Sequence, residues 1–127
     1  MAGPILLDTD ILVDYFRGLN KAMDFVHRHS ERIILSSIVV AELFAGVKGD
    51  SEKDILENFF SLFRIIPVNY EIAKVGGLFK RDFGKSHGVG LADALLAATA
   101  EAERAELKTL NIRHYPMIKG LRPAYFK

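Results

Sequence analysis

Short apolar runs alternate with longer amphipathic stretches along the chain, and this alternation predicts strands that alternate with helices. Uninterrupted apolar runs are typical of strands buried on both faces of a parallel sheet. We expect strands at residues 5–7, 32–35, 65–68 and 107–110, and a further short strand near Ile118. Pro67 has no backbone N–H to donate, so the third of these strands is expected at a sheet edge or at a strand end.

Residues with helical periodicity occupy the segments between these runs. The expected helices span 11–16, 21–29, 38–47, a stretch that begins at Ser51, 70–85 and 91–105. Ser37 is the expected N-cap of the third helix. Gly76 and Gly77 weaken the prediction for 70–85, because glycine disfavours helix interiors. Together these elements predict an α/β fold with a mostly parallel sheet and helices on both faces.

Composition limits the kind of protein this is. The chain has 127 residues, half of them hydrophobic, and no cysteine. This length fits one domain, 1–127, with its own core, and the composition excludes a disordered chain or a disulfide scaffold. No apolar run approaches the roughly 18 residues of a membrane span, and we identify no signal peptide. We therefore expect a cytoplasmic protein without a membrane partner.

Isolated acidic residues are the main chemical signal. Each is the only charge, or one of two, in a long uncharged run: Asp8 and Asp10 in 3–13, Glu42 in 33–47, and Asp93 in 88–100. A carboxylate drawn toward a core costs on the order of several kcal/mol unless it is paired or binds a metal. Glu42 shares a helical face with Ile38 and Ala45, and we expect that face to pack inward.

The position of these acids predicts a metal site. In parallel sheets the functional crevice lies beyond the carboxyl ends of the strands, where Asp8 and Asp10 are expected. Hard oxygen ligands suit Mg²⁺ or Mn²⁺, and carboxylates gathered without a cation repel one another. Simpler roles remain open: Asp93 in a first helical turn complements the helix dipole, and Asp8 or Asp10 caps the helix that follows. Asp14 is expected to be an exposed acid.

Four segments resemble, in order, the motifs of PIN-domain nucleases. They are residues 7–12 (LDTDIL), 37–43 (SIVVAEL) with Gly46, 91–100 (LADALLAATA) and 109–115 (TLNIRHY). The chain is also similar in length to the VapC-type toxins of bacterial and archaeal toxin–antitoxin pairs. The resemblance implies a three-layer α/β/α sandwich and Mg²⁺- or Mn²⁺-dependent endoribonuclease activity.

The resemblance also implies which residues act. Asp8, Glu42 and Asp93 match the three acidic positions that hold the metal. Asn111 matches a fourth catalytic position that is often Asp, and its missing charge leaves open whether one or two ions bind. Thr9 and Thr109 match small hydroxyl positions that bind a ligand or a metal-bound water, although a plain turn role is equally open. His114 lies near Asn111, and we expect a structural role for it.

The implied partners are an RNA substrate, a small cognate antitoxin and a second copy of the chain in a homodimer. The formal net charge is only +1, with 17 Lys and Arg against 16 Asp and Glu. That balance argues against RNA binding by bulk charge alone. A metal bound by three acids would offset part of their charge, so we expect local recognition by individual bases. Candidates are Arg17, Lys21, Arg28, Arg81, Lys85, Arg113 and Lys119.

Two alternatives remain. Asp8 and Asp10 after a strand also resemble the nucleophile and the acid/base of haloacid-dehalogenase-like phosphatases, but the later Lys and Gly-Asp motifs of that class are missing. A catalytically weak interaction module of the same fold is the second alternative, and Asn111 is its only support.

Overall fold

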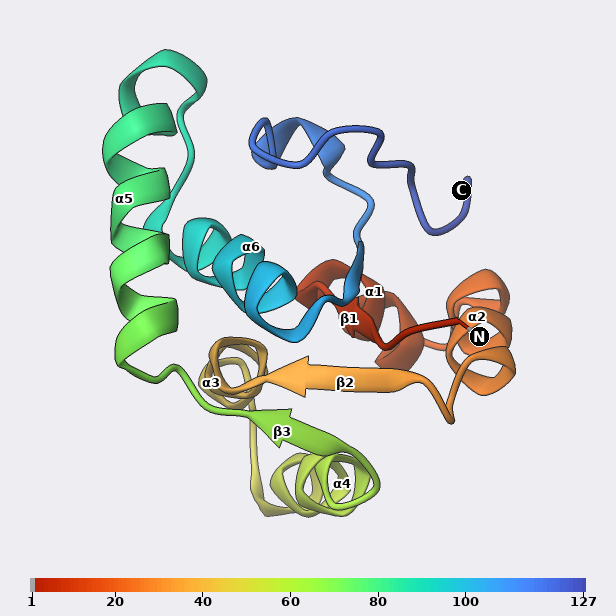
Figure 1. Cartoon of the computed structure of the whole chain (residues 1–127). Helices are drawn as coiled ribbons and strands as arrows, with labels where there is room; N and C mark the ends of the chain where they lie inside the picture. The colour runs from red at the N-terminus through yellow and green to blue at the C-terminus, as the bar shows by residue number, and fades with distance from the viewer. Residues whose placement is uncertain (1) are drawn as a thin grey trace.

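Four parallel strands form a central sheet within residues 2–127, which are the residues that this computed structural model describes (Figure 1). The strand order is β3-β2-β1-β4. The strands are β1 (Ile5–Leu7), β2 (Ile33–Ser36), β3 (Arg64–Ile66) and β4 (Glu106–Lys108). β1 and β2 are buried along their whole length, as their uninterrupted apolar runs predict. β3 lies at an edge, as Pro67 predicts.

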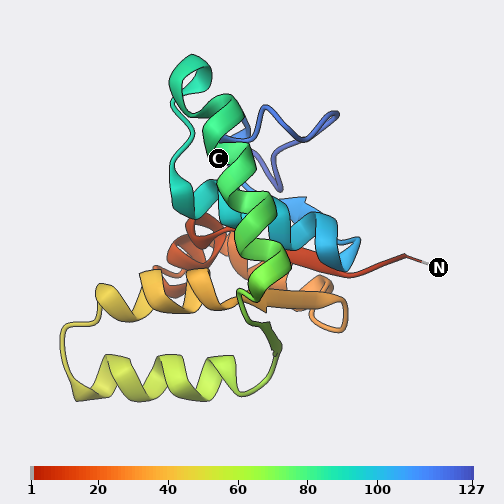
Figure 2. The ribbon, with the colours of Figure 1, turned by 60° about the vertical axis from the view of Figure 1, so that its left-hand side comes forward.

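Helices connect the strands and surround the sheet, which confirms the predicted α/β sandwich (Figures 1 and 2). They are α1 (Thr9–Phe16), α2 (Asn20–Arg28), α3 (Ser37–Ala45), α4 (Asp50–Phe60), α5 (Tyr70–His87) and α6 (Leu91–Glu103), followed by a short 3₁₀ turn, Ile112–His114. Among the residues described, no helix combines the length and the apolar character needed to cross a membrane.

The two glycines that weaken the helix prediction do not interrupt α5. Gly76 is buried where α5 packs against α6, and a Cβ atom built there would lie 2.6 Å from the Leu95 side chain and 3.1 Å from its Cα. Gly77 faces open space. Gly76 therefore permits the close approach of the two helices. Helix propensity, which depends only on local sequence, could not predict this tertiary contact.

Two local predictions are wrong. The N-cap of α3 is Ser36, not Ser37, because the Ser36 hydroxyl accepts from Ile38 N at 3.0 Å. The strand expected near Ile118 is absent from the described chain, where residues 116–120 form turns. Ile118 N donates to the Tyr115 carbonyl at 3.0 Å, and Gly120 adopts a φ of 73° that turns the chain.

Candidate active site

Asp8 lies directly after β1, where the strand ends and α1 begins. It is the N-cap of α1 and accepts from Thr9 N at 2.7 Å. Its other oxygen, Oδ2, accepts from Tyr115 Oη at 2.7 Å and from Thr109 Oγ1 at 2.8 Å. Both oxygens of this buried carboxylate therefore have protein donors.

Asp93 comes to the same place from the first turn of α6. Its Oδ1 accepts from Tyr115 Oη at 3.2 Å, and its Oδ2 lies 3.2 Å from His114 Nδ1. Burial and the negative charge of Asp8 raise the pKa of Asp93. Asp93 thus has partners beyond the helix dipole, and His114 is in direct contact with a candidate metal ligand.

Tyr115 is the member of the cluster to which sequence reasoning assigned no role. Its buried hydroxyl bridges Asp8 and Asp93, and burial together with these carboxylates raises the pKa of Tyr115 far above its ordinary value. It therefore stays a neutral donor. The sequence shows that Tyr115 ends the 109–115 motif. It does not show which side chains the Tyr115 hydroxyl contacts, because those partners are distant in the chain.

Glu42 reaches the cluster from α3, although not in the predicted way. Its Oε1 accepts from Thr9 Oγ1 at 2.6 Å, so Thr9 connects α1 to α3. The face shared by Ile38, Glu42 and Ala45 does not pack inward, since Glu42 and Ala45 are exposed and Ile38 is half-buried. The buried residue of α3 is Val39. α3 is apolar on almost every side, so its pattern did not identify the inner face.

The side chain of Asp10, in α1, forms hydrogen bonds with residues 109–111. Its Oδ2 accepts from Leu110 N at 2.8 Å, from Asn111 Nδ2 at 3.1 Å and from Thr109 Oγ1 at 3.2 Å. Its Oδ1 is buried and has no hydrogen-bond partner. Burial, and then the charge of Asp8, raise the pKa of Asp10 to about 6. Because the Asn111 amide group donates to Asp10, the carbonyl of Asn111 is the group left for a ligand.

Asp14 is also part of this region, contrary to the expectation of an exposed acid. It is buried, accepts from Tyr125 Oη at 2.8 Å, and lies 3.0 Å from Lys127 Nζ. The partners belong to residues 123–127, which we call the C-terminal segment. They are more than 100 residues away in the chain, so local pattern could not predict the burial.

These side chains surround one cavity of about 420 Å³. All four predicted residues, Asp8, Glu42, Asp93 and Asn111, line it. The cavity is also lined by Thr9, Asp10, Val13, Asp14, Arg17, His114 and Lys127. The structure therefore brings the predicted residues together and adds Asp10 and Asp14, so five acids face two permanently charged bases.

No three His, Asp or Glu side chains of residues 2–127 already meet at the spacing of a metal centre. The hydrogen bonds explain this spacing. Thr9 holds Glu42, while Tyr115 and Thr109 hold Asp8. A cation that binds here would have to take the place of some of these donors.

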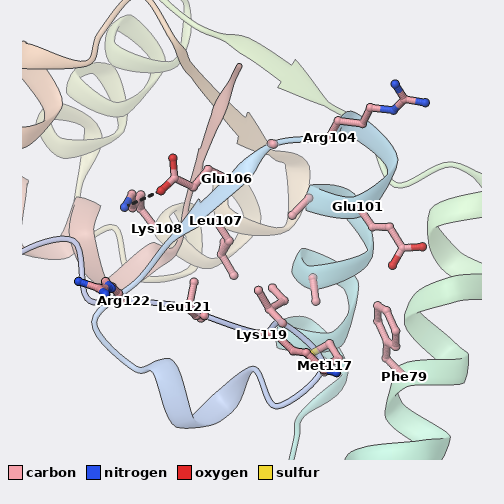
Figure 3. A pocket seen from close by; sticks show the side chains of 15 residues that line it. Phe79, Glu101, Arg104, Glu106, Leu107, Lys108, Met117, Lys119, Leu121 and Arg122 are labelled. Carbon is pink, nitrogen blue, oxygen red and sulfur yellow. Dashed lines mark ion pairs between the residues drawn. The ribbon is translucent and has the colours of Figure 1, made fainter. Parts of the chain in front are cut away.

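A separate cavity of about 660 Å³ lies between β4, α6 and residues 117–122 (Figure 3). Phe79, Leu107, Met117 and Leu121 are among its lining residues. Of its two acids, Glu106 is paired with Lys108 at 2.8 Å. This cavity lacks the gathered carboxylates, so we place the candidate active site at the carboxyl edge of the sheet.

Comparison with known proteins identifies the family of the chain. The PIN domain family matches residues 5–116. Ribonuclease VapC19 of Mycobacterium tuberculosis is 41% identical over 124 residues, covering 94% of this chain and 98% of that protein. Ribonuclease VapC10 of the same organism is 34% identical over 124 residues, covering 95% and 92%.

A solved toxin-antitoxin complex from Klebsiella pneumoniae contains a chain of the same fold. It has a TM-score of 0.83 and 28% identity, and the match covers 95% of this chain and 98% of that one. Sequence and fold therefore agree over nearly the whole length, and the chain belongs to the PIN-domain family, in which its relatives include VapC ribonucleases.

Proposed function

We propose that this protein is a divalent-metal-dependent endoribonuclease, a single domain over 1–127, that acts as the toxin of a toxin–antitoxin pair. The observation that carries the proposal is the convergence of Asp8, Glu42 and Asp93 on one cavity from three distant parts of the chain. The relatives named as VapC ribonucleases support the reaction and its RNA substrate.

The donor set fits Mg²⁺ or Mn²⁺. Asp8, Glu42 and Asp93 offer the hard oxygen ligands that these ions prefer. The Oδ1 of Asp10 is buried without a hydrogen-bond partner in the same cavity, and burial together with the Asp8 charge raises the pKa of Asp93. A bound cation would offset the negative charge gathered there. Bound there, the cation would polarise the scissile phosphate and make a water more acidic.

The remaining steps belong to side chains of the cavity. Tyr115 orients Asp8 and Asp93 through its hydroxyl, and Thr9 orients Glu42. One of these carboxylates accepts the proton of the attacking water and directs the water oxygen in line at phosphorus. The opposite P–O bond breaks as the new one forms, and the leaving sugar oxygen takes a proton from solvent. Asp10 holds Asn111 at the rim, where the Asn111 carbonyl can contact a water or the substrate.

Cleavage of single-stranded RNA by the purified chain tests this proposal. We expect cleavage with MgCl₂ or MnCl₂ and none with EDTA. Asp93→Asn should lower the rate by about 100-fold or more while its circular dichroism spectrum is unchanged, because a metal ligand is lost. Asp54→Asn, on the exposed side of α4, is the matched control. If Asp8→Asn and Asp93→Asn cleave like the parent chain, the site assignment is wrong.

The structural relatives support the proposed partner. The Klebsiella chain comes from a toxin-antitoxin complex, and another relative of known structure is VapBC2 from Rickettsia felis, bound to a DNA fragment from its promoter. We propose a small antitoxin that covers the acidic cavity, and co-expression of such a partner with this chain should abolish cleavage. The homodimer and the cytoplasmic location remain predictions.

Neither alternative is favoured. The phosphatase is not favoured because the later motifs of that class are missing and the family matched over residues 5–116 is the PIN domain. Membership of the PIN family, with ribonucleases as relatives, also favours an active nuclease over an inactive module.

A further inference from the structure

The C-terminal segment, residues 123–127, is fixed beside the acidic cavity. Tyr125 Oη donates to Asp14 Oδ2 at 2.8 Å, and Lys21 Nζ of α2 donates to the Phe126 carbonyl. Figure 1 shows the end of the chain running toward α2. The segment is therefore attached to both α1 and α2, which fixes the backbone at Phe126 and the side chain of Tyr125.

Lys127 places an ammonium group at the mouth of the acidic cavity. Its Nζ lies 3.0 Å from Asp14 Oδ2 and 3.1 Å from Asp14 Oδ1. The Lys127 side chain is 59% exposed, whereas that of Asp14 is 8% exposed. An ammonium has three donors, and one carboxylate uses at most two of them here. At least one donor of Lys127 is left for an anion at a cavity in which acids outnumber bases.

Phe126 is the aromatic neighbour of this cation. It is 76% exposed and lines a second cavity of about 390 Å³. That cavity shares Asp10, Asn111 and Lys127 with the acidic cavity, so the two are adjacent. An exposed aromatic ring beside a cation is the arrangement with which proteins bind single-stranded nucleic acid, the ring stacking on a base and the cation contacting the backbone.

We propose that Phe126 and Lys127 form a subsite for one unpaired nucleotide of the RNA, with the base on the Phe126 ring and a phosphate at the Lys127 ammonium. The subsite rests on the proposed ribonuclease function and adds a substrate contact to it. Tyr125 and Asp14 are positioning residues, because they hold Lys127 and do not themselves contact the RNA.

The surroundings favour a nucleotide over an apolar protein side chain. Asn111 and the backbone beside it are polar groups that can bond to a base edge, and Asp10 lies next to them. A purely apolar occupant would use Phe126 but would leave the remaining donor of Lys127 and the side-chain carbonyl of Asn111 unused. Of the two permanently charged bases that line the acidic cavity, Arg17 was among the sequence candidates and Lys127 was not.

Binding measured without metal tests the subsite separately from cleavage. A fluorescein-labelled single-stranded RNA oligonucleotide is titrated with the full chain in EDTA, and its anisotropy is followed. Phe126→Ala and Lys127→Met should each weaken binding by about 5-fold or more, whereas Phe126→Trp should retain it because the indole also stacks. The salt dependence should become shallower in Lys127→Met, by roughly the 0.7 slope of one phosphate contact on a single strand.

Matched controls lie away from both cavities. Tyr70→Ala removes a ring that is 77% exposed, and Lys48→Met removes an exposed lysine. Neither position lines the two cavities, so neither change should alter binding. A quenching signal from 2-aminopurine in the oligonucleotide that is lost in Phe126→Ala reports the stack directly.

The two proposals fail in different ways. Absence of metal-dependent cleavage by the parent chain would overturn the ribonuclease function, and the anisotropy series would still measure the subsite. Unchanged RNA binding by Phe126→Ala and Lys127→Met, in a parent chain that cleaves, would overturn the subsite alone. The subsite is also wrong if these variants bind RNA normally and lose only the antitoxin.

Discussion

At the scale of single residues, hydrogen bonds between distant side chains hold the acids of the cavity in place. Tyr115 Oη donates to both Asp8 and Asp93, and the neutral hydroxyl offsets part of the repulsion between two carboxylates. The hydrogen bonds of Asp10 are unevenly shared between its two oxygens. Three donors contact Oδ2, while Oδ1 is buried without a partner. Burying these carboxylates costs folding free energy, and the protein bears that cost where the acids gather around the cavity.

Asp10 should make the metal-free protein less stable at higher pH. Its pKa is raised from 3.8 to about 6, so between these values the folded state binds more protons than the unfolded state. Stability therefore falls as pH rises through that window and is lowest above it. In EDTA, the thermal midpoint should decline from pH 4 to pH 7.

Asp10→Asn should flatten this decline, since Asn keeps one acceptor oxygen and does not ionise. The variant should also be more stable than the parent at pH 7.5 in EDTA. A parent and variant with parallel pH profiles, measured by differential scanning calorimetry, would show that Asp10 is not the group responsible.

At the scale of elements, the contact between α5 and α6 depends on one glycine. Gly76 is buried against Leu95, whereas Gly77 beside it has nothing within 4 Å of a built Cβ. A side chain added at Gly76 would therefore disturb helix packing, whereas one added at Gly77 would change only the helix propensity. Packing also outweighs local pattern in α3, because the elements that it contacts decide which of its faces is buried.

Gly76→Ala should destabilise the fold by about 1–3 kcal/mol, the usual cost of overpacking, because its Cβ would lie 3.1 Å from the Leu95 Cα. Gly77→Ala should stabilise it by about 0.5–1 kcal/mol, because alanine has the higher helix propensity and no clash opposes it. Urea unfolding of both variants measures the difference. Equal effects of the two changes would contradict this account of the helix contact.

At the scale of the whole molecule, charge is distributed unevenly although it nearly cancels. Five of the 16 acids line the cavity, together with Arg17 and Lys127 of the 17 bases. The rest of the chain then has 11 acids and 15 bases. Near-neutrality thus hides an acidic cavity in a moderately basic surface, which suits an RNA enzyme that depends on a cation.

Metal binding should therefore stabilise the native protein. A ligand at 100 times its dissociation constant adds about 2.7 kcal/mol if it binds only the folded state, so MnCl₂ should raise the thermal midpoint by several degrees over EDTA. Asp8→Asn and Glu42→Gln should reduce that rise because each loses a ligand charge. Asp54→Asn should keep it in full, and a rise of equal size in all variants would place the ion elsewhere.

The sequence by itself determined the order and type of the main elements. Buried strands and amphipathic helices follow from hydrophobic period, which depends only on neighbouring residues. It also placed Asp8 at the carboxyl end of the first strand, on the edge where parallel strands direct all their carboxyl ends, and Asp93 in the first turn of a helix. The four predicted residues consequently line one cavity.

Only the tertiary structure decided the contacts that join distant segments. It buried Asp14 under Tyr125, turned the Tyr115 hydroxyl toward two acids, left Glu42 exposed and brought Lys127 to the cavity. These partners lie far apart in the chain, and a local pattern has no information about which distant side chain will fill a given space. Burial and hydrogen bonding are properties of the assembled surfaces, so they appear only when the sheet, the helices and the C-terminal segment are packed together.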